Sequence, residues 1–259
     1  MIIYNNIAHT LSARRFEKMD FKNINIMVGI AALFSTVSLN SPGSDLNENH
    51  IHKISNYEIK SDSKIYTVLT PLEEIIPQNL RGFKEYDEYA HSVMMSNSSQ
   101  IFLTKDVGNN FVIYMIPHHE AAIITSTGIL KYTQNMDVKN LAYRIIRSQE
   151  KEVVLMQKLL ESGELRGNDN PEFLNKMKKI MVKMMKEMKP YNNQANDATE
   201  VTKSYLENMT IHHEGAVLMA KEYLKYGKNQ ELIKMSQKII LSQDEEIKEM
   251  KQILKKANY

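Results

Sequence analysis

Two histidine pairs are the residues of this sequence best suited to chemistry. The first lies in Tyr114–Ala122, which reads Tyr-Met-Ile-Pro-His-His-Glu-Ala-Ala, and the second in Asn208–Ala216, which reads Asn-Met-Thr-Ile-His-His-Glu-Gly-Ala. Residues three and four apart share one face of a helix, so each pair has a methionine beside it. Adjacent residues point about 100° apart around a helix. We therefore expect one ring of each pair to face a bundle interior and the other an adjoining groove.

A thioether and two imidazoles form a donor set of soft to borderline character. Such donors suit Cu(I) through Met and either copper state through His, whereas magnesium and calcium prefer carboxylates and carbonyls. Zinc is less well matched, because its usual ligands in proteins do not include thioethers. The sequence therefore predicts a copper ion, Cu(I) or Cu(II), with zinc as the weaker candidate. Paired structural histidines and a pH-sensitive interface are the alternatives.

Both histidine pairs belong to an internal repeat with an offset of 94 residues (212 − 118 = 94). Residues 111–160 align with residues 205–254 without a gap, which predicts two tandem copies of one module. The matched pairs include Met115 and Met209, His118 and His212, His119 and His213, Gln149 and Gln243, Glu152 and Glu246, and Met156 and Met250.

A stripe of polar and thioether side chains follows each histidine pair on a later helix. In the first copy it contains Gln149, Glu152 and Met156, at i, i+3 and i+7. A carboxylate there could accept the second imidazole N–H and so fix the orientation of the ring. A solvated helix face is the equal alternative. We take Glu152, Glu246, Gln149 and Gln243 as candidates that support the ligands, and Met156 and Met250 as candidate ligands.

Five methionines line one face of an earlier helix in the second copy: Met177, Met181, Met184, Met185 and Met188. Core packing is the commoner reason for such a face, because Met fills irregular gaps well. A shift of 94 residues places Met188 on Met94 and Met185 on His91. We therefore add four candidate ligands from this corner of the two copies, which are His91, Met94, Met185 and Met188.

These motifs resemble those of a ferritin-like family of domains of unknown function, family 305, which includes copper-binding proteins of the CopM type. The resemblance covers about residues 81–259 and rests on Phe111-x-x-x-Met115-Ile-Pro-His118-His119, on Ser148-Gln149-x-x-Glu152, and on their counterparts. It implies a helical bundle, an exported location, and copper binding in tolerance, storage or trafficking. The ligands that it implies are Met115, His118, His119, Met209, His212 and His213, with Met219 as a further candidate. Thr125 stands where the second copy has Met219, so a first site that depended on this methionine would be weaker.

The elements that must position these residues are helices. Beyond Arg81 the apolar pattern is helical, and we expect three helices in each copy. The expected ranges are about 83–95, 108–132 and 138–161 in the first copy, and 171–189, 198–226 and 231–256 in the second. Short polar connections make the last two helices of each copy antiparallel neighbours. The predicted fold is an all-α, ferritin-like helical bundle built from two tandem three-helix repeats, residues 81–165 and 170–259.

An apolar, uncharged run at residues 24–39 precedes the repeats. It is short for a spanning helix and better matched to the hydrophobic part of a secretory signal. We predict a signal or anchor segment at residues 1–44, with Met19 as an alternative start, and a linker at residues 45–80. The protein is expected to be exported, periplasmic or extracellular, or anchored in a membrane through residues 24–39. A copper-trafficking protein is then an expected partner.

Composition excludes several other classes of function. The chain has no Cys, so thiolate metal sites and thiol redox chemistry are ruled out. Its 33 basic residues balance 31 acidic ones without a basic run, so we expect no nucleic-acid partner.

Two rival functions remain beside copper binding. A di-iron or di-manganese oxidoreductase would share the bundle but draws on Glu-x-x-His pairs, and neither histidine pair has a Glu three residues before it. The zincin pattern His-Glu-x-x-His is also missing. A metal-free helical interaction module is the second rival. We predict a metal-binding protein that is not an enzyme.

Overall fold

Six helices make up the part of the chain that the computed structural model describes, residues 76–100, 106–166 and 168–259. They are α3 (Phe83–Gln100), α4 (Val107–Tyr132), α5 (Met136–Ser162), α6 (Pro171–Glu187), α7 (Ala198–Tyr226) and α8 (Gln230–Lys256). These ranges contain no strand, and their one isolated β-bridge joins Asp106 to Asp169. The predicted all-α bundle is confirmed. Each expected helix is present, and α7 has the predicted bounds.

The expected signal or anchor segment, residues 1–44, lies outside the described residues, as does most of the expected linker, residues 45–80. None of the helices in the described ranges combines the length and the apolar character needed to cross a membrane. The described residues all belong to one compact unit, Ile51–Tyr259.

Polar side chains at the helix starts explain why four of these helices begin where they do. Asn135, Asn170, Asp197 and Asn229 each accept hydrogen bonds from two backbone N–H groups of the first turn. These N–H groups have no partner inside the helix, so the cap satisfies them. In α6 the cap is followed at once by Pro171, whose missing N–H costs nothing at this position.

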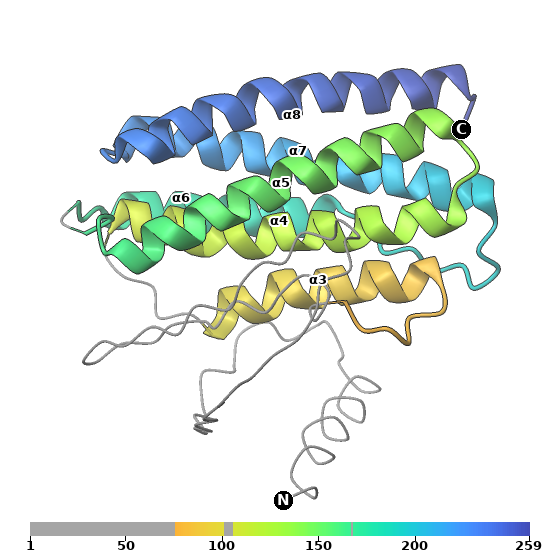
Figure 1. The fold of residues 1–259 in the computed structure, drawn as a ribbon, viewed down its shortest axis with the longest axis horizontal. Coiled ribbons are helices and arrows are strands. Elements are labelled where there is room, and N and C mark those ends of the chain that lie inside the picture. The colour runs from red at the N-terminus through yellow and green to blue at the C-terminus, as the bar shows by residue number, and fades with distance from the viewer. Residues whose placement is uncertain (1–75, 101–105, 167) are drawn as a thin grey trace, which may run out of the picture. The chain divides into compact units, whose positions relative to one another are not determined.

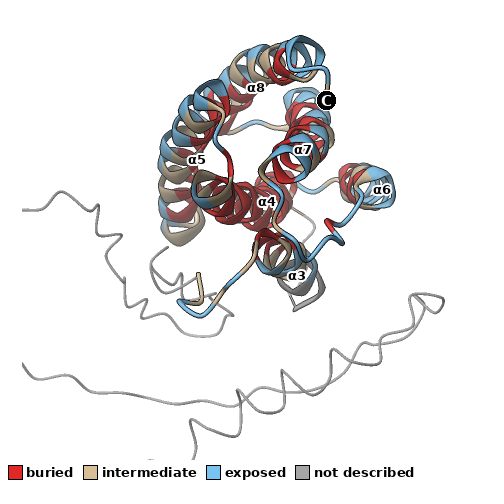
Figure 2. Ribbon diagram, turned by 90° about the vertical axis from the view of Figure 1, so that its right-hand side faces the viewer, coloured by how far each residue is buried: buried red, intermediate tan, exposed pale blue. Residues whose placement is uncertain are grey.

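α4 and α7 lie at the centre of the bundle and pack against each other. α5 covers α4 and α8 covers α7 on one side, while α3 packs on α4 and α6 packs mainly on α7. Seen from the end, α5 and α8 lie together on one side of the central pair and α3 and α6 on the other (Figure 2). Nearly every residue from Val107 to Ile129 of α4 is buried, as expected of a helix surrounded by others.

Helix direction follows from the short connections. The colour gradient of Figure 1 shows α3 and α4 running in opposite directions, as α4 and α5 do. Pro117 lies inside α4, yet the helix continues from Val107 to Tyr132 around it. His118 in α4 and its counterpart His212 in α7 are therefore each presented from a continuous helix.

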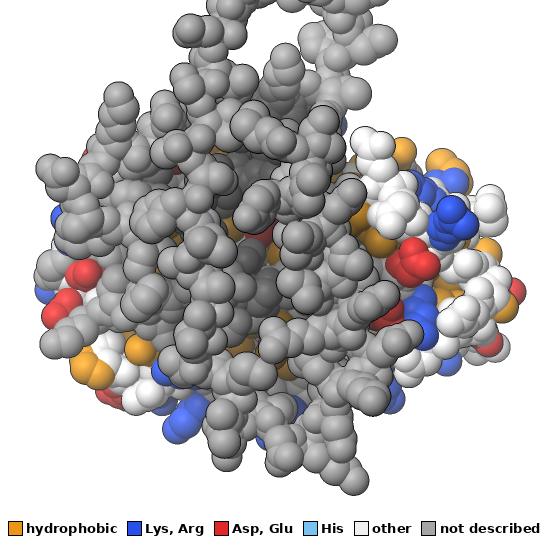
Figure 3. All heavy atoms as spheres, turned by 90° about the horizontal axis from the view of Figure 1, so that it is seen from below, with side chains coloured by type: hydrophobic (Ala, Val, Ile, Leu, Met, Phe, Trp, Pro, Cys, Tyr) orange, Lys and Arg blue, Asp and Glu red, His pale blue; other side chains and the backbone are white. Residues whose placement is uncertain are grey.

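The surface of the described residues carries charges of both signs. On the part of the face in Figure 3 that these residues form, basic and acidic side chains lie intermixed with hydrophobic ones. This face is unlike the single-sign basic patch that binds a phosphate backbone.

Candidate metal centre

His118 of α4 and His212 of α7 meet in the middle of the bundle. Their ring centroids are 3.6 Å apart and the ring planes are tilted by 37°. Both side chains are buried, with 0% and 2% of their surface exposed. The two residues occupy matching positions of the sequence repeat, so the contact between α4 and α7 brings the first histidine of each pair together.

A thioether lies against this pair of rings. The Sδ atom of Met184, on α6, is 3.3 Å from Nε2 of His118. Met184 is also buried, with 3% of its surface exposed. Three soft or borderline donors from three helices thus converge in a site closed to water.

Burial keeps these two imidazoles neutral. It lowers the pKa of both His118 and His212 well below the usual range, and the neighbouring histidines lower it further. A neutral imidazole has one N–H and one lone pair. Among the described residues, Nδ1 of His118 and both ring nitrogens of His212 have no hydrogen-bond partner. Buried polar atoms almost always have a hydrogen-bond partner. Ring nitrogens without one are therefore suited to bind a metal ion or a water molecule.

The second histidine of each pair points to the third helix of its own half. His119 Nε2–H donates to Glu152 of α5 over 2.9 Å, and His213 Nε2–H donates to Glu246 of α8 over 3.0 Å. The carboxylate contact expected from the helical stripe is therefore present in both halves. Rings of neighbouring histidines diverge, with centroids 6.2 Å apart in the first pair.

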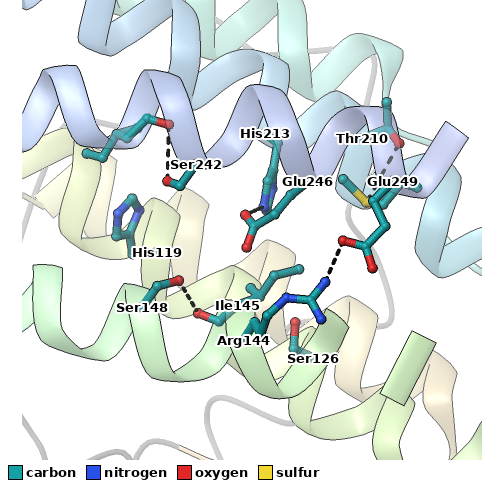
Figure 4. Close-up of polar contacts among 12 residues, drawn as sticks. His119, Ser126, Arg144, Ile145, Ser148, Thr210, His213, Ser242, Glu246 and Glu249 are labelled. Carbon is teal, nitrogen blue, oxygen red and sulfur yellow. Dashed lines mark hydrogen bonds and ion pairs between the residues drawn. The ribbon is translucent and has the colours of Figure 1, made fainter. Parts of the chain in front are cut away.

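Ion pairs between a basic side chain of one helix and a carboxylate of the other link α5 and α8. Lys238 of α8 lies 3.5 Å from Glu152, which therefore meets both a histidine and a lysine. The matching residue of α5 is Arg144 (238 − 94 = 144), and it reaches Glu249 rather than Glu246 (Figure 4). The two halves are alike in their His–Glu bonds and differ in the cations around them.

The supporting glutamines are buried near these carboxylates on the same helices. Gln149 and Gln243 are 1% and 2% exposed. Within the described ranges, both side-chain atoms of Gln149 and the Oε1 atom of Gln243 lack a hydrogen-bond partner. Neither glutamine is bonded to a histidine, so the role predicted for them rests on position alone.

The other predicted thioethers are buried without such a contact. Met115, Met156, Met219 and Met94 belong to one core cluster, and Met209 and Met250 to another. Met250 accepts a hydrogen bond from the Thr210 hydroxyl at 3.7 Å. In the described part of the chain, none of the predicted thioether sulfurs makes a hydrogen-bond contact with a histidine nitrogen. Their role as ligands stays a prediction.

On α6, the methionine that contacts a histidine is not one of the two predicted ligands. Met185 and Met188, the two predicted ligands, lie at the partly buried edge of the helix, while Met184 points inward to His118. The inward face of α6 comprises Phe173, Met177, Met181 and Met184. The methionine stripe includes Met184, but which of its members meets a histidine depends on how α6 is rotated against α7, and the sequence pattern does not reveal this rotation. The roles of Met185 and Met188 as ligands stay predictions.

The first helices of the two halves correspond with an offset of 90, not 94. Phe83 contacts Tyr132, with ring centroids 6.4 Å apart, and Phe173 contacts Tyr226 at 5.9 Å. The tyrosines differ by 94 residues (226 − 132 = 94), whereas the phenylalanines differ by 90 (173 − 83 = 90). α3 and α6 are thus displaced by one helical turn relative to the rest of the repeat.

This displacement reassigns the matching residues. Met94 corresponds to Met184 rather than to Met188, and His91 corresponds to Met181 rather than to Met185. Nδ1–H of His91 donates to the backbone oxygen of Asp87 over 2.8 Å. Its Nε2 atom is buried and has no partner among the described residues.

Carboxylate-rich metal sites find little support in this geometry. Across residues 76–100, 106–166 and 168–259, no group of three His, Asp or Glu side chains could hold a metal ion. One Glu-x-x-His spacing does occur in the chain, Glu88 to His91, but the Glu88 side chain is 56% exposed and pairs with Lys84.

Comparison with known proteins places the motifs in a family. A family model described as domain of unknown function (DUF305) matches residues 108–254 in one span. A solved structure described as CopM in the Ag-bound form (by soaking) is similar, with 26% identity and a TM-score of 0.45 over 59% of this chain and 98% of that chain. No curated protein matches this chain.

Proposed function

This chain belongs to the DUF305 family of domains of unknown function, and we propose that it binds a soft monovalent metal ion, Cu(I), between His118, His212 and Met184. The ion is cargo that is held and released, in copper tolerance, storage or trafficking, rather than a catalytic cofactor. The observation that carries the proposal is the 3.3 Å contact between the Met184 sulfur and His118, against the buried ring of His212.

The donor types support copper over harder ions. Thioether sulfur and imidazole nitrogen are the ligands that Cu(I) prefers, whereas magnesium and calcium need several oxygens. Zinc bonds to cysteine sulfur and to imidazole nitrogen are about 2.0–2.3 Å long, and bonds of this order allow one ion to reach two donors that lie 3.3 Å apart. One ion can therefore bridge Met184 and His118 with little movement of the helices.

The protonation state of His118 and His212 supports metal binding. Metal ligands must offer a free lone pair, so a histidine that is protonated at neutral pH loses affinity. Burial lowers the pKa of His118 and His212 well below its usual range, which leaves both rings neutral at pH 7. The His119–Glu152 and His213–Glu246 bonds hold the flanking rings in place, so α4 and α7 present the inner pair in fixed positions.

Two other functions compete with this proposal. A di-metal oxidoreductase needs converging carboxylates, and Glu152 and Glu246 are instead each engaged by a histidine of their own half. A metal-free interaction module predicts that no metal changes the stability of the fold. We propose binding without catalysis, and export through the N-terminal apolar run with a copper-trafficking partner.

The proposal is tested by measuring the affinity of the purified chain for Cu(I) under anaerobic reducing conditions, in competition with a colorimetric chelator. Replacing Met184 with Leu keeps the volume and removes the sulfur. We expect Met184→Leu to weaken Cu(I) binding by roughly tenfold to a hundredfold, the loss typical when a group that tunes a metal site is removed. Zn(II) affinity should change much less.

Met235→Leu is the matched control, because Met235 is similarly buried on α8 and, unlike Met184, makes no hydrogen bond to a histidine among the described residues. It should bind Cu(I) like the unchanged chain. Ligand binding to the folded state raises the unfolding temperature by mass action. If Cu(I), Cu(II) and Zn(II) all leave the unfolding temperature unchanged, the chain is a metal-free module and the proposal is wrong.

A further inference from the structure

Gly215 of α7 lies where the Met184 sulfur meets His118. A Cβ atom at this position would be 2.5 Å from Sδ of Met184, 3.2 Å from its Cγ and 3.5 Å from Nε2 of His118. Real Cβ atoms do not approach other atoms to 2.5 Å, so the thioether can occupy this place only beside a glycine. The backbone of Gly215 is helical and needs no unusual conformation, which leaves space as the reason for glycine here.

The matching position in the other half carries a side chain. Gly215 corresponds to Ala121 of α4 (215 − 94 = 121), which is 3% exposed. In this alignment, the methyl group of Ala121 stands where Gly215 has no side chain. Glycine in the middle of a helix is destabilising relative to alanine, so glycine at position 215 has a stability cost that its helical backbone does not explain.

Counting residues along the helices places a methionine opposite Ala121, as Met184 lies opposite Gly215. On α6 and α7, Phe173 contacts Tyr226 and Met184 contacts Gly215. The second contact lies eleven residues from the first along each of these antiparallel helices. On α3 and α4, Tyr86 packs on Gly128. A Cβ atom added at Gly128 would lie 2.8 Å from the Cβ atom of Tyr86. Along this antiparallel pair, Met94 lies eight residues after Tyr86 (94 − 86 = 8) and Ala121 seven residues before Gly128 (128 − 121 = 7), about two turns further on in each helix. Met94 and Ala121 belong to the same core cluster.

The two methionines differ in their contact with a histidine. Met94 is as buried as Met184, with 1% of its surface exposed. His212 is the counterpart of His118, yet neither of its nitrogens has a sulfur or other partner within the described residues. The same residue types thus give a thioether contact beside glycine and none beside alanine.

We infer that Gly215 is the specificity-determining residue of the site: by lacking a Cβ it admits the Met184 thioether to His118, while Ala121 keeps Met94 away from His212. The inference rests on the proposed function and adds that the histidine pair takes thioether ligation on its α6 side alone. Soft ions such as Cu(I) and Ag(I) gain from this sulfur, and a nitrogen-preferring ion such as Zn(II) gains little.

The test uses Ag(I), a soft monovalent ion, and compares single substitutions in the whole chain. Binding affinity is measured by competition, and the number of sulfur neighbours of the bound ion is measured by X-ray absorption at the silver edge. Gly215→Ala should lower Ag(I) affinity about tenfold or more and remove a sulfur neighbour. Ala121→Gly should add a sulfur neighbour or a second bound ion, and Met94→Leu in the same chain should cancel this gain.

Ala122→Gly is the matched control for Ala121→Gly, since it introduces glycine at the next position of α4 and faces the other core cluster. It should leave the sulfur count as it is. The inference is overturned if Ala121→Gly has the sulfur count of the unchanged chain, or if Gly215→Ala keeps its sulfur neighbour and its affinity. Should Gly215→Ala fail to fold, Ala121→Gly still decides. An unchanged chain that binds no Ag(I) or Cu(I) would instead contradict the proposed function itself.

Discussion

At the residue scale, each histidine pair divides its two rings between two tasks. His118 and His212 keep unpaired nitrogens in the centre of the bundle, and His119 and His213 donate to glutamates of α5 and α8. This division follows from the helix geometry, because adjacent side chains point about 100° apart. The outer histidines thereby hold α4 to α5 and α7 to α8 at the level of the inner pair.

The carboxylate of Glu152 should matter more for stability than that of Glu246. Glu152 has 6% of its side chain exposed and meets both His119 and Lys238, whereas Glu246 is 12% exposed and bonded to His213. Loss of a partner from a buried polar group costs about 1–3 kcal/mol. We expect Glu152→Ala to lower the free energy of unfolding by about 2 kcal/mol and Glu246→Ala by about 1 kcal/mol, measured by urea unfolding of the metal-free protein.

A control for these variants is Glu245→Ala, at an exposed position of the same α8 helix. Exposed substitutions away from special features change stability by less than about 0.5 kcal/mol. Equal losses at Glu152 and Glu246 would show that Lys238 contributes nothing to the first pair.

At the element scale, the helices could be predicted from the sequence because their signals are local. Asn229 and Asp197 are cap residues directly before an apolar periodic run, and the expected and observed ranges of α7 coincide. The contact of His118 with Met184 could not be predicted, because it depends on how α6 is rotated and shifted against α7. That shift is set by ring contacts between distant residues such as Phe173 and Tyr226.

The same distinction applies to the repeat. A single offset of 94 aligns the histidine and glutamate helices, whose connection has equal length in both halves. It fails for α3 and α6 by one turn, because each is joined to the repeat through a separate loop. Met94 and Met184 were therefore assigned to different roles by the sequence pattern, although the aromatic contacts make them counterparts.

The cap of α8 offers a test of how far local signals stabilise the element that carries Glu246. Asn229 accepts hydrogen bonds from the N–H groups of Glu231 and Leu232, each 3.0 Å long. Replacing a capping Asn with Ala typically costs about 1 kcal/mol. We expect Asn229→Ala to lower the free energy of unfolding by that amount in chemical denaturation. Lys228→Ala, one residue earlier and exposed, is the control, and an equal loss there would contradict a capping effect.

At the scale of the whole molecule, the two halves are joined chiefly through α4 and α7. Besides the contact between the His118 and His212 rings, a buried hydrogen bond crosses between Ser126 of α4 and Tyr205 of α7 and is 2.8 Å long. A second polar bridge joins the hydroxyls of Thr133 and Thr202 over 2.7 Å. The proposed metal site thus lies on a packed contact that these two polar bridges cross, so we expect the stability of the contact and the geometry of the proposed site to be coupled.

Tyr205 allows this coupling to be measured through alkaline pH. Burial raises its pKa well above the ordinary value near 10. Above pH 10 the unfolded chain therefore loses this proton while the folded chain keeps it, so the folded state binds more protons and its stability falls as pH rises. A difference of one proton corresponds to about 1.4 kcal/mol per pH unit. Denaturant unfolding of Tyr205→Phe between pH 9 and 11 should show a decline shallower by about this amount. Equal declines in both proteins would mean that Tyr205 ionises without opening the contact between α4 and α7, and that this contact is looser than the hydrogen bond to Ser126 indicates.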